Sequence, residues 1–68
     1  MVYVRTLKNN TWWYIVKSTG EGNDHYFLYP EMRIAFDFET KAEALQFTIE
    51  GDIDNWYIEF ESLEVLEL

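Results

Sequence analysis

One segment of this sequence has the pattern of a helix, and it is only about ten residues long. Thr40 to Glu43 match the capping box, in which the threonine oxygen accepts from the Glu43 amide and the Glu43 carboxylate reaches back. Gly51 is expected to end the helix in the left-handed conformation. Such a helix spans ~15 Å, whereas five strands at ~4.8 Å spacing make a sheet about 20 Å wide. One helix can therefore cover only one face of the sheet.

The remaining segments are rich in the β-branched and aromatic residues typical of strands. Strands are expected at residues 2–7, 11–18, 25–29, 34–38 and 56–66, with the helix before the last one. This order predicts an α+β fold, an antiparallel sheet of four to five strands with one helix packed on one face. A chain of 68 residues forms one small domain, spanning residues 1–68.

Asn9 and Asn10 separate the first two expected strands and suit a two-residue primed turn, because asparagine tolerates positive φ. The resulting register pairs Leu7 with Trp12, Arg5 with Tyr14, and Tyr3 with Val16. Side chains alternate between the faces of a strand. We expect one face beneath the helix (Val2, Val4, Trp13, Ile15) and the other facing solvent or a partner (Tyr3, Leu7, Trp12, Tyr14). The opposite assignment stays open.

The later segments carry further expectations about burial. Residues 19–24 are expected to form a flexible loop, and Ile34, Phe36 and Phe38 to point inward. The helical periodicity puts five residues on the core face (Ala42, Ala44, Leu45, Thr48, Ile49) and leaves Phe47 on the polar side with Glu43, Gln46 and Glu50. The last strand is expected to point five residues inward, with a β-bulge near Ser62 (Trp56, Ile58, Phe60, Leu63, Val65).

The charge is distributed unevenly. Residues 1–41 contain five basic and five acidic residues, while residues 42–68 contain eight acidic residues and no lysine or arginine, which accounts for the net charge of −8. Direct binding to nucleic acid or to anionic membranes is disfavoured, because phosphate-binding surfaces need basic side chains. The sequence has no signal-peptide pattern and no apolar run of membrane-spanning length, so a cytoplasmic location is expected.

Catalytic and cofactor chemistry finds little support. The chain has no cysteine, so thiolate catalysis and thiolate metal sites are excluded. His25 is the sole histidine, and neither Ser18 nor Ser62 lies in a nucleophile-elbow pattern. The segment from Asp52 resembles the start of a calcium loop, but it lacks the required glycine and the final glutamate. We therefore expect no enzyme activity, no metal site and no cofactor.

The acidic residues suggest a protein-binding surface instead. Glu59 and Glu61 share a face at about 6.6 Å spacing, roughly half the charge density of one DNA strand, so a second row of carboxylates is needed to imitate a phosphate backbone. An ordinary solubilising face is the alternative interpretation. The candidate partner-binding residues are three aromatic residues of the uncovered sheet face, one aromatic residue on the helix and seven acids: Tyr3, Trp12, Tyr14, Phe47, Glu43, Glu50, Asp52, Asp54, Glu59, Glu61 and Glu64.

Residues 36–60, FDFETKAEALQFTIEGDIDNWYIEF, combine a strand, a capped helix, an acidic loop and an aromatic strand. In this pattern the chain resembles small acidic accessory proteins encoded by phages and prophages. The resemblance implies an inhibitor of a host enzyme that handles nucleic acid, such as a restriction, CRISPR or repair protein. It implies no catalytic residue and leaves the target open.

The leading hypothesis is a non-enzymatic protein whose acidic C-terminal half occupies a basic, nucleic-acid-binding surface of another protein. The first alternative is a structural or scaffolding protein that forms a homodimer through the face of Tyr3, Trp12 and Tyr14. The second alternative is a small-ligand module with an aromatic pocket between sheet and helix.

Overall fold

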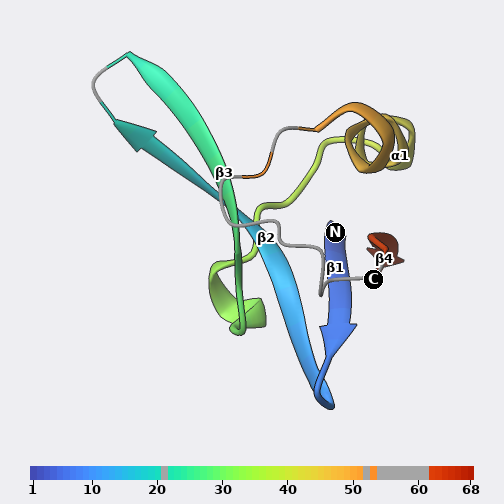
Figure 1. Ribbon diagram of the computed structural model, residues 1–68. Helices are drawn as coiled ribbons and strands as arrows, with labels where there is room; N and C mark the ends of the chain where they lie inside the picture. The colour runs from blue at the N-terminus through green and yellow to red at the C-terminus, as the bar shows by residue number, and fades with distance from the viewer. Residues whose placement is uncertain (21, 52, 54–61) are drawn as a thin grey trace.

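A computed structural model describes residues 1–20, 22–51, 53 and 62–68, without the side chain of Asn23. It contains a four-stranded antiparallel sheet with one α-helix packed against it, which confirms the predicted α+β fold (Figure 1). The elements are β1 (Val2–Lys8), β2 (Thr11–Gly20), β3 (Asn23–Tyr29), the 3₁₀ helix η1 (Met32–Ile34), α1 (Lys41–Glu50) and β4 (Glu64–Glu67). The strand order is β3-β2-β1-β4, so β4, from the end of the chain, pairs with β1.

The first hairpin forms as predicted. Asn9 and Asn10 have φ angles of 52° and 61°, and positive φ at both positions is the requirement of a type I′ turn. Arg5 lies opposite Tyr14 and Leu7 lies opposite Trp12. This ladder ends at Arg5 and Tyr14, so the expected pair of Tyr3 with Val16 is not part of it.

The second hairpin is longer than the sequence predicted. Thr19 and Gly20 belong to β2, where they pair with Asp24 and Asn23 of β3, so these four residues are strand and not loop. Gly22 has a φ angle of 89°, which favours glycine and allows the chain to reverse tightly. The ladder between β2 and β3 therefore extends as far as Gly20 and Asn23.

Residues 34–38 do not form the expected strand. Ile34 ends η1 and is 44% exposed, and residues 35–38 then run in an extended path. The Phe36 amide donates to the Ile15 carbonyl at 2.9 Å and the Phe38 amide donates to the Val2 carbonyl at 2.8 Å. The carboxylate of Asp37 accepts from the Val2 amide, also at 2.8 Å. The segment thus bonds to β1 and β2 past the end of the ladder between them. The main-chain groups at these positions are not used by that ladder, so they are available to hold the segment in place.

The predicted start of α1 is confirmed, but its predicted end is wrong. Thr40 has an extended conformation, and its hydroxyl oxygen accepts from the Glu43 amide at 3.1 Å. Gly51 has a φ angle of −64°, so it is not left-handed. A Cβ atom at Gly51 would lie 2.5 Å from the Phe47 carbonyl oxygen and 2.8 Å from the Phe47 ring. Glycine is therefore required here because the chain passes close to Phe47.

The helix packs through a different face from the one predicted. Ala44 is fully buried and Thr48 is half-buried as expected, but the other three predicted core residues are exposed: Ala42, Leu45 (47%) and Ile49 (80%). Phe47, which was expected on the polar side, packs against the core. The ring of Phe47 contacts two other aromatic rings, and burying this larger apolar surface outweighs burying the two aliphatic side chains.

The sheet face beneath α1 is the predicted one. Its buried cluster consists of residues from β1, β2, β3, α1 and residues 35–38, the crossing segment (Val2, Val4, Ile15, Leu28, Phe38, Ala44). Leu63 and Val65 pack against this cluster, as expected for inward residues near the end of the chain. The expected inward residues Trp56, Ile58 and Phe60 lie outside the described residues.

The opposite face is not bare, which corrects the prediction. Tyr3 is 9% exposed, and Tyr14 and Val16 are each 7% exposed. Tyr14 lies between Arg5 and Tyr29 across the ladders, and Tyr3 lies opposite Leu66. The prediction assumed that a face without a helix is exposed, and these exposed fractions show that this face is covered.

We predict that Gly51→Ala destabilises the protein, because the added methyl group overlaps the carbonyl and ring of Phe47. Overpacking of this kind costs about 1–3 kcal/mol, which urea unfolding followed by tryptophan fluorescence can measure. Gly20→Ala is the matched control, since a Cβ atom there meets nothing within 4 Å. Equal unfolding free energies for the two variants would contradict the proposed role of Gly51.

Candidate functional site: an aromatic pocket with an acidic rim

The structure separates the predicted partner-binding residues into groups. Tyr3 and Tyr14 are buried and therefore unable to form the exposed aromatic row that was expected. Trp12 is half-buried, beneath the guanidinium of Arg5, and Glu64 pairs with the same arginine. Asp52, Asp54, Glu59 and Glu61 lie outside the described residues.

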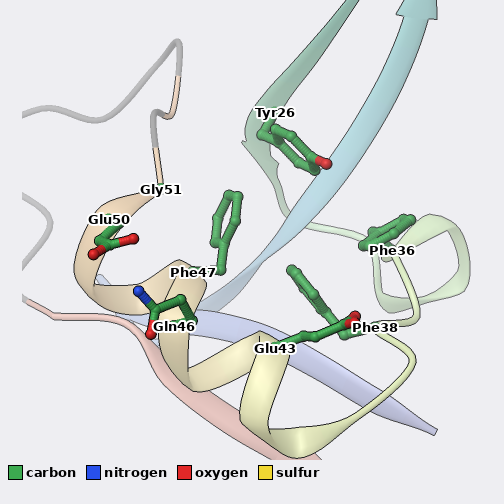
Figure 2. A pocket seen from close by; sticks show the side chains of 8 residues that line it. All are labelled: Tyr26, Phe36, Phe38, Glu43, Gln46, Phe47, Glu50 and Gly51. Carbon is green, nitrogen blue, oxygen red and sulfur yellow. The ribbon is translucent and has the colours of Figure 1, made fainter.

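The remaining three predicted residues lie together. Glu43, Phe47 and Glu50 line a pocket of about 340 Å³ between α1, β3 and the crossing segment, and Figure 2 shows it from close by. The rest of the lining consists of Tyr26, Phe36, Phe38, Gln46 and Gly51. Ligand pockets commonly measure about 300–1,000 Å³, so this pocket suits a single side chain or a small molecule.

Four aromatic rings form the apolar wall of the pocket, and each contacts the next. Tyr26 lies 4.8 Å from Phe47 between ring centroids, and Phe47 lies 5.3 Å from Phe38. Phe38 lies 4.8 Å from Phe36, which in turn lies 6.1 Å from Tyr26. The interplanar angles range from 56° to 84°, which are tilted and edge-to-face arrangements. The wall is therefore a closed circuit of four rings.

Local structure explains why these rings converge. Tyr26 and Leu28 alternate with outward residues on β3 and point to the helix side of the sheet. Phe36 and Phe38 share one side of the extended segment, whose amides are held by Ile15 and Val2. Phe47 lies about one turn from Glu43 and from Glu50 along α1, so these three residues form one stripe.

The sequence carried only part of the signal for this site. The inward direction of Phe36 and Phe38 was predicted and is confirmed. Tyr26 and Gln46 were not among the candidates, although the alternation over residues 25–29 could have placed Tyr26 with the core. The wall also depends on the rotation of α1 about its axis, which buries Phe47. Helical periodicity predicted that a different face of α1 packs against the core.

Charges around the pocket are predominantly negative. Four basic side chains form ion pairs with carboxylates on the same chain: Arg5 with Glu64, Lys17 with Asp24, Arg33 with Glu31 and Lys41 with Glu67. Across the described residues, no ion pair involves Glu39, Glu43 or Glu50. The carboxylates of Glu43 and Glu50 thus carry uncompensated charge at the pocket rim.

His25 is exposed and is not among the residues that line the pocket. Within residues 1–20, 22–51, 53 and 62–68 there is no cluster of three metal-ligating side chains. In the same part of the chain, no helix has the length and apolar character needed to cross a bilayer.

Comparisons of the chain with protein-family models, curated protein sequences and solved structures found no significant match. Evidence for function therefore comes from the geometry and charge of the molecule itself.

We predict that Phe47→Ala lowers the free energy of unfolding by about 2–4 kcal/mol, because the ring contacts with Tyr26 and Phe38 are lost. Ile49→Ala, on the same helix but 80% exposed, is expected to change it by less than about 0.5 kcal/mol. Thermal and urea unfolding of both variants measure the difference. A larger loss for Ile49→Ala would show that the helix packs through the face predicted from its periodicity.

Proposed function

We propose that this protein is a non-enzymatic binding protein that occupies a basic, nucleic-acid-binding surface of another protein. Its carboxylates take the place of nucleic-acid phosphates, and an apolar contact completes the interface. In this role it would act as an inhibitor, because a surface covered by the protein is closed to nucleic acid. The proposal agrees with the inhibitor class that the sequence resembles.

The observation that supports this proposal is the imbalance of free charge. Four of the chain's basic side chains are engaged with its own carboxylates, while Glu39, Glu43 and Glu50 have no cationic partner among the described residues. Residues 42–68 add further acids and no base. A field of this sign speeds association with a basic surface and opposes binding to nucleic acid.

The pocket supports the same proposal because it can supply the apolar contact of the interface. Protein interfaces gain most of their affinity from a few desolvated anchor contacts surrounded by a polar rim. The four-ring wall beside Glu43 and Glu50 combines an apolar surface with such a rim. The alternative dimer surface has no similar support, since two of its three rings are buried within the chain.

Affinity capture tests this proposal. The immobilised protein is incubated with nuclease-treated bacterial lysate, and bound proteins are eluted with a duplex DNA fragment or with a salt gradient. We expect basic nucleic-acid-binding proteins to be displaced by DNA, with retention falling steeply as salt rises.

The variant Glu39→Gln, Glu43→Gln, Glu50→Gln removes the three carboxylates without a cationic partner among the described residues, at nearly constant side-chain size. Retention of the captured proteins is expected to fall at least several-fold. Captured proteins that resist DNA and salt, or retention that is unchanged in the variant, would refute binding to a nucleic-acid surface.

A further inference from the structure

We infer that the pocket is a receptor for the guanidinium group of an arginine side chain presented by the partner protein. This inference rests on the proposed function, because basic nucleic-acid-binding surfaces are rich in exposed arginine. It goes further by naming the group that enters the pocket and the residues that hold it. Three features support it: the sign of the rim charge, the chemistry of the wall and a similar contact elsewhere in the chain.

The rim excludes anions and favours cations. Glu43 and Glu50 are exposed residues of α1, seven positions and roughly 10 Å apart along the helix axis. They lie at two ends of the pocket stripe, with the amide of Gln46 between them. One entering cation can pair with one carboxylate while the other adds to the negative potential of the mouth.

The wall favours a cation over a neutral apolar group. Aromatic faces carry partial negative charge, and a cation within about 6 Å of a ring centroid is attracted to it. Four rings line this pocket, so an entering cation meets an aromatic wall. A carboxylate rim over an aromatic wall is therefore matched to organic cations.

Guanidinium fits this combination better than ammonium. It is planar, weakly hydrated and able to stack on an aromatic ring while its N–H groups donate to a carboxylate. An ammonium group is compact and strongly hydrated, so it loses more hydration when it enters an apolar pocket. The volume of about 340 Å³ accommodates one side chain of this size.

The protein itself contains an example of the proposed contact. The guanidinium of Arg5 lies 3.6 Å from the centroid of the Trp12 ring and donates to Glu64 at 2.8 Å. One arginine thus contacts an aromatic face and donates to a carboxylate at the same time. The pocket offers the same two kinds of group, and across the described residues its carboxylates have no such cation.

Lys17 does not fill this role. Its ammonium lies 5.3 Å from the Phe36 centroid, but it is paired with Asp24 at 3.5 Å and is not among the pocket-lining residues. Its ammonium is therefore engaged with a carboxylate outside the pocket. The space bounded by Glu43, Phe47 and Tyr26 stays open to an external group.

The test titrates the full chain, with ¹³C-labelled aromatic residues, with the peptide acetyl-Gly-Arg-Gly-amide. We expect saturable shifts of the ring signals of Tyr26, Phe36, Phe38 and Phe47. The same peptide with citrulline, a neutral analogue of arginine, is expected to bind at least tenfold more weakly. The lysine peptide and tetramethylammonium are each expected to bind several-fold more weakly than the arginine peptide.

Two double variants with the same change in net charge locate the binding. Glu43→Gln with Glu50→Gln removes the rim charges and is expected to weaken binding of the arginine peptide at least tenfold. Glu31→Gln with Glu67→Gln removes two exposed charges outside the pocket and is expected to change binding by less than twofold. Circular dichroism and thermal unfolding confirm that both variants are folded.

Several results would overturn the inference. Equal binding of the citrulline peptide would show that the pocket does not select cations, and tighter binding of lysine or tetramethylammonium would contradict the choice of guanidinium. Equal losses in the two double variants would assign the binding to overall charge. DNA-displaceable capture by the unmodified protein would still stand in each case, so failure of the pocket and failure of the proposed function are distinguishable.

Discussion

Residues 36–38 bond to β1 and β2 at positions past the end of the ladder between these two strands, and the rest of the domain is arranged around this contact. The amides of Phe36 and Phe38 donate to carbonyls on β2 and β1, and Asp37 accepts from the first residue of β1. These bonds fix the direction of two phenyl rings at the boundary of the core. They also determine where the chain leaves the sheet, and the cap at Thr40 follows two residues later. The position of α1, and with it the pocket, depends on this crossing.

Local signals predicted local structure well. Two adjacent asparagines predicted a primed turn because few other residues tolerate positive φ, and that turn set the register of Arg5 with Tyr14. A threonine three residues before a glutamate predicted the start of the helix for a similarly local reason. The alternation of Phe36 and Phe38 predicted their direction even though the segment is not a strand.

The predictions were wrong where contacts between residues that are distant in the sequence determine the structure. The periodicity of α1 offered two aliphatic side chains to the core, but Phe47 has ring partners on β3 and on the crossing segment that periodicity cannot reveal. Gly51 was assigned to the usual helix ending, whereas its need for glycine comes from the approach of Phe47. Tyr3 and Tyr14 were expected to be exposed because no second helix exists, yet the opposite face of the sheet leaves them buried. The pocket depends on these long-range contacts. The sequence therefore predicted only the part of the pocket that lies on the polar stripe of the helix.

The four rings of the pocket have two roles, because Phe38 belongs to the buried core and the other three pack against it. Replacing any of them changes the fold as well as the cavity. Glu43, Gln46 and Glu50 are different, since they are exposed on one stripe of α1. The wall of the pocket therefore cannot be changed without changing the fold, whereas the rim residues can be substituted. Selection, or a protein engineer, can retune its preference among incoming groups at three helix positions without rebuilding the scaffold.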